Sequence, residues 1–430
     1  MVPEQSHFID GIGHIPSDWV VKTANEISLK ITKGTTPPKA DIIDHQEIPF
    51  LRVNNLGFNG VIDKKSDFIF VSRNAHENFL ARSKAYPGDI LMNIVGPPLG
   101  KVSLLGYEFS EYNMNQAIVI YRLVDDVIHR DFFLAYLLSD TAQQWLQSRS
   151  KKTSGQQNLT IELCKGLPVP IPAFAEQKKI ARILSTWDKA ITTTEQLLAN
   201  SQQQKKALMQ QLLTGKKRLL DNNGVRFSGE WVHGRLGELC TFKGGSAFKE
   251  EYQGHSEGDL PFIKVSDMNL RGNEKYIGYA NNWLTNQAAK EIKAKAFPKD
   301  AIVFAKVGAA LLLNRRRILL RPTIIDNNMM AAIPASSGDT EFIYQLMLAV
   351  DFAKFVQDGA VPSVNQGDLA SFKITYPEKE EQQKIAAVLS AADQEITILQ
   401  QKLTALKQEK QALMQQLLTG KRRVKVEVAA

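Results

Sequence analysis

The longest regular pattern in the chain is a seven-residue repeat of apolar side chains, and it occurs in two separate stretches. Residues 176–218 and 381–423 align without a gap at an offset of 205, and 25 of the 43 aligned positions are identical. Both stretches lack Gly and Pro until Gly215 and Gly420, and their interiors are rich in good helix formers. The pattern predicts two helices of about 39 residues, each roughly 58 Å long, with the two glycines at their C-terminal caps.

The apolar rows of the two helices predict a coiled-coil seam. The predicted seam residues are Ile180, Leu184, Trp187, Ile191, Leu198, Leu208 and Leu212 in the first stretch and Ile385, Leu389, Ile396, Leu399, Leu403, Leu406, Leu413 and Leu417 in the second. Thr194 and Ser201 interrupt the first row, so the first helix needs a partner, and the second helix packed antiparallel is the obvious one. Lys205 and Lys410 occupy equivalent seam positions, where a lysine either fixes the register or extends its ammonium group to solvent.

A weaker repeat precedes each helix in the same order. Residues 16–20 match 228–232, residues 48–53 match 260–265, residues 86–89 match 297–300 and residues 131–133 match 341–343. The shared order indicates that the chain is one unit used twice. A period this long, present in only two copies, argues against a solenoid. The expected divisions are a first module at 1–172, a helix at 173–218, a second module at 219–377, a helix at 378–423 and a tail at 424–430.

Each module is expected to be an α+β domain with a twisted, mostly antiparallel sheet. Apolar runs between turn signals predict strands at 48–53 and 89–95 in the first module and at 260–265 and 301–307 in the second. Helical patterns cover residues 132–138, 142–146 and 342–356.

Composition narrows the class of partner. The 430 residues carry a formal net charge of +8, which favours a polyanionic partner without choosing between nucleic acid and a membrane surface. The chain has no run of 18 apolar residues and no signal-peptide pattern, so no membrane span is expected. Two distant cysteines, Cys164 and Cys240, predict neither a disulfide framework nor a zinc site, and they fit the reducing cytoplasm.

Basic and amide side chains follow the predicted strands, and polar Gly-containing turns recur in both modules. Such side chains can read base edges or neutralise phosphates, although for any single residue a solvated loop is the more ordinary explanation. The candidate DNA-binding residues are Lys33, Thr35, Arg52, Asn54, Asn55 and Lys101 in the first module and Lys243, Ser246, Lys264, Ser266, Arg315, Arg316 and Arg317 in the second.

The sequence lacks the catalytic, phosphate-binding and metal-binding motifs that would indicate an enzyme. The run 96–101 has the wrong spacing for a phosphate-binding loop, no metalloprotease motif occurs, and Asp300 and Lys306 lack the middle carboxylate of a nuclease metal site. We therefore expect no catalytic residue, no metal site and no cofactor bound by this chain.

The chain resembles the specificity subunits of Type I restriction–modification enzymes over nearly its whole length. The resemblance rests on Trp19 and Trp231 near the start of each module and on a Pro-x-x-x-Glu-Gln-x-Lys-Ile motif at the start of each helix, at 172–180 and 377–385. It also rests on the Leu-Leu-Thr-Gly-Lys motif that ends both helices. It implies two target-recognition domains related by a pseudo-two-fold axis and separated by two conserved helices that form an antiparallel coiled coil.

The resemblance also implies a function and partners. Each domain would bind one half of a split, asymmetric target on double-stranded DNA. Two methyltransferase subunits would methylate adenine with S-adenosylmethionine, and restriction and translocase subunits would use ATP and Mg to cleave unmodified DNA. All these cofactors belong to the partner subunits. The competing interpretations are a stand-alone sequence-specific DNA-binding regulator, a self-contained nuclease and a coiled-coil scaffold.

Overall fold

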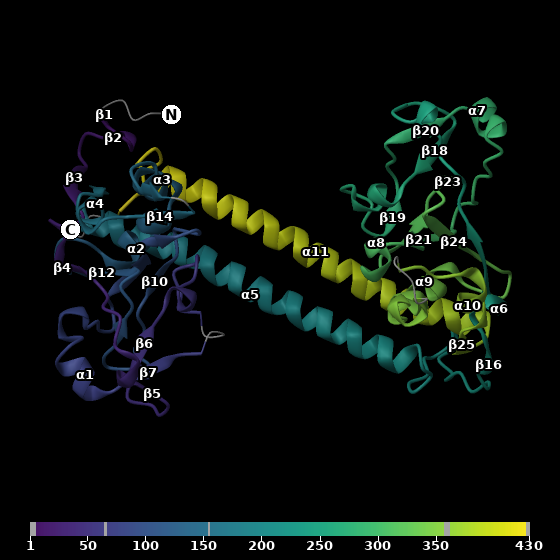
Figure 1. Cartoon of the computed structure of the whole chain (residues 1–430), viewed down its shortest axis with the longest axis horizontal. Coiled ribbons are helices and arrows are strands. Elements are labelled where there is room, and N and C mark those ends of the chain that lie inside the picture. Colours follow the sequence, from purple (N-terminus) through teal and green to yellow (C-terminus); the bar gives the residue numbers. More distant parts are fainter. Residues whose placement is uncertain (1–5, 64–66, 154, 357–361, 427–430) are drawn as a thin grey trace. The chain divides into compact units, whose positions relative to one another are not determined.

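The chain forms two compact units, each containing one half of both long helices (Figure 1). The computed structural model describes residues 6–63, 67–153, 155–356 and 362–426. Unit 1 comprises Met1–Glu195 and Lys402–Ala430, and unit 2 comprises Gln196–Gln401. Within the described residues, no helix is both long and apolar enough to cross a membrane.

Unit 1 is built around a four-stranded antiparallel sheet with the order β10-β8-β12-β4, beside a second sheet with the order β11-β6-β7-β5. The strands of these two sheets are β4 (Ser28–Lys33), β5 (Ile42–Ile43), β6 (Ile48–Leu51), β7 (Ile69–Val71), β8 (Ile90–Asn93), β10 (Val102–Leu104), β11 (Asn113–Met114) and β12 (Ile118–Leu123). The strands of the smaller sheets are β1 (Ser6–Ile9), β2 (Gly13–Pro16), β3 (Val20–Thr23), β9 (Val95–Gly96), β13 (Lys151–Thr153), β14 (Gln156–Asn158) and β15 (Pro168–Ile171). The short helices are α1 (Arg73–Glu77), α2 (Arg130–Leu138), α3 (Asp140–Ser148) and α4 (Ile161–Lys165).

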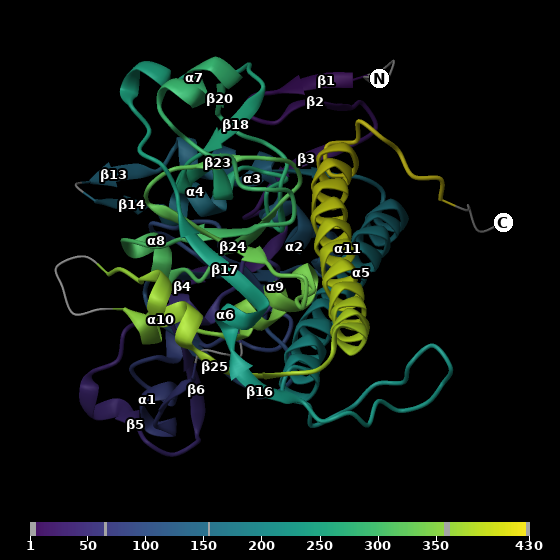
Figure 2. The same ribbon diagram turned by 90° about the vertical axis from the view of Figure 1, so that its right-hand side faces the viewer.

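Unit 2 repeats this plan with a five-stranded sheet, β17-β24-β21-β22-β19, and a three-stranded sheet, β20-β18-β23. The strands are β16 (Val232–Arg235), β17 (Cys240–Gly244), β18 (Leu260–Ile263), β19 (Tyr276–Ile277), β20 (Asn282–Leu284), β21 (Ile302–Ala305), β22 (Arg316–Leu319), β23 (Ile324–Ile325), β24 (Met329–Pro334) and β25 (Lys373–Tyr376). The short helices are α6 (Leu236–Leu239), α7 (Asn286–Glu291), α8 (Ala309–Leu312), α9 (Thr340–Ala349) and α10 (Gln366–Ser371). In Figure 2, α9 lies between the five-stranded sheet and α11.

The predicted α+β architecture with mostly antiparallel sheets is confirmed in both units. Parallel pairing of named strands in the described residues is confined to β11 with β6, β18 with β23 and β19 with β22. The strand orders β10-β8-β12-β4 and β22-β21-β24-β17 correspond position by position, as expected for one unit used twice. The pseudo-two-fold relation between the two domains stays a prediction.

The two long helices, α5 (Phe174–Leu212) and α11 (Lys379–Leu417), each contain 39 residues, as the heptad pattern predicted. Each helix ends three residues before its predicted glycine, and Gly215 and Gly420 close the turn that follows with φ values of +70° and +69° that L-residues rarely tolerate. A Cβ atom at Gly215 would lie 3.2 Å from the Trp231 ring, and one at Gly420 would lie 2.4 Å from the Pro16 ring. The glycines therefore also allow the chain to pass close to the start of each module.

Within each unit, the halves of α5 and α11 lie side by side and run antiparallel (Figures 1 and 2). In unit 1, Lys410 of α11 pairs with Asp188 of α5 at 2.5 Å. Lys407, one turn before Lys410 in α11, pairs with Glu195, which lies two turns after Asp188 in α5. In unit 2, Lys205 pairs with Asp393 at 2.5 Å. The predicted antiparallel pairing of the two helices is confirmed on this evidence.

The predicted seam residues are all buried or half-buried, and none is exposed. The buried ones are Ile180, Leu184, Leu212, Ile385, Leu389 and Leu417. The half-buried ones are Trp187, Ile191, Leu198, Leu208, Ile396, Leu399, Leu403, Leu406 and Leu413. Of the two interpretations of the seam lysines, the structure favours register, because the Lys205 and Lys410 side chains are only 14% and 16% exposed and each binds an aspartate of the opposite helix.

Each unit is closed by an arginine that follows one long helix and binds the buried glutamate at the start of the other. Arg218 donates two hydrogen bonds of 2.6 and 2.7 Å to Glu381. Arg423 donates two of 2.9 and 2.8 Å to Glu176 and two of 2.8 Å to Asp18, which lowers the pKa of Asp18. Such bidentate pairs fix geometry as well as adding free energy, so they hold the helix ends against each module.

One element differs from the prediction. Residues 342–356 were expected to form one helix, but α9 ends at Ala349 and a separate 3₁₀ helix covers Phe352–Phe355. The Val350 carbonyl accepts a hydrogen bond from Arg316, and the Asp351 side chain accepts one from the Ala353 amide. These bonds replace the next helical turn, because side chains of this kind compete with the helix for backbone groups.

Candidate nucleic-acid interface

In unit 1, a short turn follows the buried strand β6 and carries three candidate DNA-binding residues. The Asn55 side chain is fully buried and accepts a hydrogen bond of 2.8 Å from the Arg52 backbone amide. Arg52 is half-buried and donates to the Asp67 carbonyl at 3.3 Å, while Asn54 is exposed at the tip. Asn55 therefore shapes the turn, and its burial argues against the predicted DNA contact, while Arg52 and Asn54 stay candidates.

Unit 2 forms the same turn after the matching strand β18. The Asp267 carboxylate is fully buried and accepts a hydrogen bond of 2.7 Å from the Lys264 backbone amide, as Asn55 does from Arg52. Ser266 is exposed at the tip, in the position of Asn54. The two turns thus share a backbone and differ in the side chain that they present.

A second loop follows β4 in unit 1, and it requires a glycine. A Cβ atom at Gly34 would lie 2.1 Å from the Asn115 carbonyl oxygen, so no other residue fits here. The Thr35 amide donates to the Met114 carbonyl at 2.9 Å, and the Thr35 hydroxyl accepts a hydrogen bond of 3.0 Å from Arg82. Thr35 is therefore buried and already bonded, which argues against the predicted DNA contact, whereas the neighbouring Lys33 is exposed.

The matching loop in unit 2 follows β17 and has the same construction. A Cβ atom at Gly245 would lie 2.0 Å from the Asp326 carbonyl oxygen. The Ser246 amide donates to the Ile325 carbonyl at 2.9 Å, leaving Ser246 half-buried and Lys243 exposed. Both loops are thus held against the end of a short strand, β11 or β23.

These strand ends bring the two groups of candidates together in each unit. The Asn115 amide donates to the Leu51 carbonyl at 3.0 Å, and the Asp326 amide donates to the Ile263 carbonyl at 3.0 Å. Each bond joins the residue on which the glycine loop packs to the last residue of the strand that precedes the turn. The sequence predicted these loops separately, and the structure makes one polar edge from them.

Two lysines reinforce this edge through their stems and head groups. Lys101 donates to the Val53 carbonyl at 3.2 Å, and its Nζ lies 5.8 Å from the Phe58 ring centroid. Lys264 Nζ donates to Gln253 Oε1 at 2.5 Å and lies 5.2 Å from the Phe248 ring centroid. Both lysines are half-buried, and these hydrogen bonds hold their ammonium groups in place. Each therefore presents a fixed positive charge of the kind that binds phosphate.

The three consecutive arginines in unit 2 have separate roles. Arg316 is fully buried, with its guanidinium carbon 3.8 Å from the Phe352 ring centroid, and burial lowers its pKa to about 10. Its side chain donates to Asn314 and to the Val350 carbonyl at 3.0 Å each. Arg316 is therefore a core residue, and its burial argues against the predicted DNA contact.

The other two arginines support the turn that follows β18. Arg315 is exposed and donates to the Asn269 side chain, and Arg317 is half-buried and donates to the Met268 carbonyl at 3.1 Å. Burial lowers the pKa of Arg317. Arg315 is the better candidate for DNA contact because its guanidinium faces solvent.

Asn115 and Asp326, which lie where the two loops meet, were not among the residues predicted to bind DNA. Asn115 is half-buried, and Asp326 is 7% exposed with a pKa raised by its burial. Asn115 follows β11 and Asp326 follows β23, at an offset of 211, which is close to the offsets of the other repeated segments. That spacing is the signal that could have identified them.

The sequence matches the family described as Type I restriction modification DNA specificity domain at residues 16–200 and again at 228–408. The chain therefore belongs to this family and carries the domain twice, which confirms the predicted resemblance.

Curated relatives include the putative type I restriction enzyme MjaX specificity subunit of Methanocaldococcus jannaschii, which is 28% identical over 96% of both chains. The type I restriction enzyme EcoR124I/EcoR124II specificity subunit of Escherichia coli is 24% identical over 59% of both chains.

Solved structures with the same fold cover almost the whole chain. The S subunit of a Type-I restriction-modification system from M. genitalium aligns with a TM-score of 0.57 at 17% identity, over 97% of this chain and 99% of that one. A chain from a structure on complex assembly and conformational transition of the type I R-M system aligns with a TM-score of 0.59 at 16% identity, over 95% and 99%. These similarities support the predicted fold class.

Proposed function

We propose that this chain is the DNA sequence-specificity subunit of a Type I restriction–modification complex and binds a bipartite, asymmetric DNA target, one half-site per domain. The observation that carries the proposal is the repeated polar edge. Both family domains join a glycine loop to a turn after a buried strand by the same backbone bonds, yet they present Asn54 in one case and Ser266 in the other. Equal frameworks with unlike side chains suit two different half-sites.

The partners follow from the same proposal. Two methyltransferase subunits would methylate adenine with S-adenosylmethionine, and restriction and translocase subunits would use ATP and Mg to cleave unmodified DNA. This chain would supply sequence recognition and no catalytic residue. The complex would act in the cytoplasm, where the genomic DNA of its host is.

Mapping of methylated adenines in the genome of the host tests the proposal. The expected result is a split motif, with a non-specific gap, that is methylated in the wild-type strain and unmethylated after deletion of this gene. Restoring the gene should restore methylation at the same motif. An unchanged methylation map after deletion would contradict the proposal.

A pull-down of the full-length chain separates this function from that of a stand-alone DNA-binding regulator. A specificity subunit should co-purify with a methyltransferase subunit in constant proportion. A regulator should bind its DNA site with full affinity and without such a partner.

A further inference from the structure

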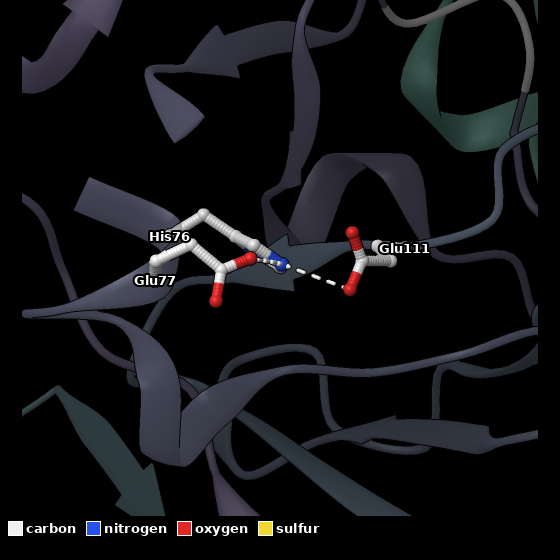
Figure 3. A group of neighbouring side chains, drawn as sticks. All are labelled: His76, Glu77 and Glu111. Atoms are coloured by element: carbon white, nitrogen blue, oxygen red, sulfur yellow. Dashed lines mark ion pairs between the residues drawn. The ribbon is translucent and has the colours of Figure 1, made fainter. Parts of the chain in front are cut away.

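His76 and Glu77, which are neighbours in the sequence, meet the more distant Glu111 in unit 1 (Figure 3). His76 and Glu77 lie at the end of α1, and Glu111 lies just before β11. His76 Nε2 is 3.3 Å from Glu111 Oε1 and 3.9 Å from Glu77 Oε1. The sequence predicted no metal site because nothing in the spacing of these residues indicates that they converge.

The surroundings of His76 fix which ring nitrogen carries a proton. The Asn113 amide nitrogen donates to the Leu80 carbonyl at 3.3 Å, so its oxygen faces His76 Nδ1, at 2.5 Å. A carbonyl oxygen only accepts hydrogen bonds, and Nδ1 is therefore the protonated nitrogen. In a neutral imidazole, Nε2 then presents a lone pair to the two carboxylates.

This lone pair is completely buried and has no hydrogen-bond partner. The His76 side chain is 0% exposed, and its Nε2 contacts Glu111 at ion-pair distance without hydrogen-bond geometry. A lone pair facing carboxylate oxygens is unfavourable unless a cation lies between them. That cation is either a proton on Nε2 or a metal ion.

The outer oxygens of both carboxylates are held by cationic side chains. Glu111 Oε2 lies 3.3 Å from Arg73, and Glu77 Oε2 lies 2.5 Å from Lys84. Each carboxylate thus keeps its other oxygen, Oε1, directed toward His76. Outer partners of this kind orient the ligands of a metal ion.

Charge and ligand type indicate the class of ion. With a neutral His76, the charges of Glu77 and Glu111 are balanced by Arg73 and Lys84. Binding would then depend on coordination bonds and not on excess negative charge. One imidazole nitrogen and two carboxylate oxygens suit Zn²⁺ or a similar transition metal, whereas Ca²⁺ takes six to eight oxygen ligands.

The matching helix of unit 2 shows that the fold does not need this cluster. Ser72 caps α1 by accepting from the amide three residues later, and Thr285 caps α7 in the same way. Aligning the two caps places Ala289 and Lys290 at the positions of His76 and Glu77.

The residues that the segment around β11 contributes to the cluster also have different counterparts in unit 2. β11 pairs in parallel with β6 through Asn113, and β23 pairs in parallel with β18 through Ile324. This register places Pro322 at the position of Glu111. The three members of the cluster, and Asn113 beside them, therefore belong to unit 1 alone, although both units share the same framework.

We propose that His76, Glu77 and Glu111 bind one divalent transition-metal ion of the Zn²⁺ class. Three protein ligands leave a fourth tetrahedral position for water. The ion would fasten α1 to the segment before β11 and so stabilise this lobe of the first recognition domain. This site is independent of the proposed DNA recognition.

Titration of the metal-free, full-length chain with Zn²⁺ alone tests the proposal. Calorimetry should give one bound ion per chain, and saturating Zn²⁺ should raise the thermal midpoint of one unfolding transition. His76→Gln and Glu111→Gln should each weaken binding by at least about tenfold. Glu111→Gln preserves the shape of the side chain, so circular dichroism should confirm that this variant is folded.

The matched controls are His233→Gln and Glu291→Gln, which remove the same side-chain types from unit 2 and should leave Zn²⁺ affinity unchanged. Absence of stoichiometric binding would overturn the proposal, as would full binding by both folded site variants. NMR that finds both His76 nitrogens protonated at neutral pH in the presence of excess Zn²⁺ would identify the proton as the occupant and would also overturn it.

Discussion

Lys205 of α5 and Asp393 of α11 form an ion pair of 2.5 Å across the helix seam. The repeat copies this relationship as Lys410 and Asp188, also at 2.5 Å, with the lysine and the aspartate on exchanged helices. Each half of the seam thus carries such a Lys–Asp pair at the same register, and a shift of one helix along the other would separate both of these pairs.

The two pairs should differ in their contribution to stability. Asp393 also accepts a hydrogen bond of 2.6 Å from Gln345, and its side chain is 24% exposed, whereas that of Asp188 is 47% exposed. Asp393→Asn should lower the free energy of unfolding by about 1–3 kcal/mol, and Asp188→Asn by less than about 1 kcal/mol because solvent screens its pair. Differential scanning calorimetry of the two variants checks this order. Equal losses would show that Gln345 adds nothing.

The neighbouring arginines Arg315 and Arg316 should respond in opposite ways to truncation. Arg316→Ala removes a buried guanidinium that stacks on Phe352, and it should cost about 3 kcal/mol or more of stability. Arg315→Ala should leave the thermal midpoint unchanged and weaken DNA binding. Thermal denaturation and DNA titration of both variants separate the two roles. A stable Arg316→Ala chain with lost DNA affinity would contradict the assignment.

The two long helices could be predicted from the sequence because their apolar periodicity is local and occurs in both copies of the repeat. Seven-residue spacing, helix-forming interiors and the glycines at 215 and 420 each depend on neighbours in sequence. The seam lysines could be located but not paired, since the aspartates that bind them are about 190–220 residues away and are found only once the helices pack.

The binding edge was predicted less well because burial, and not residue type, decides which polar groups face solvent. A run of three arginines indicates a basic surface, yet Arg316 begins a buried strand and points into the core. The alternation of a strand could have indicated this, because Arg315 and Arg317 then face away from Arg316. Asn55 and Thr35 have the right chemistry for DNA but are used to hold their own loops.

The glycine loops provide another test of the polar edge. Gly34→Ala and Gly245→Ala place a Cβ atom about 2 Å from a backbone carbonyl oxygen, so each should destabilise its own unit by at least about 2 kcal/mol. Gly106→Ala is the control, because an added Cβ there meets nothing within 4 Å. Thermal denaturation compares the three variants. An unchanged midpoint for Gly34→Ala would mean that this loop is not held against β11.

The length of the helices should set the gap between the two half-sites. Removing one heptad from α5 and the heptad paired with it in α11 shortens the seam by about 10 Å, which corresponds to roughly three base pairs. Methylome sequencing of the mutant strain should find the same half-sites with a shorter gap. Altered half-sites with the original gap would contradict a spacing role for the helices.

Exchange of one recognition domain tests whether each domain reads its own half-site. Residues 20–172 are replaced by the corresponding segment of another specificity subunit with a known target, and methylated adenines are then mapped across the genome. We expect one half-site to change to that of the donor while the other half-site and the gap stay as they were. Changes in both half-sites, or in neither, would contradict independent reading by the two domains.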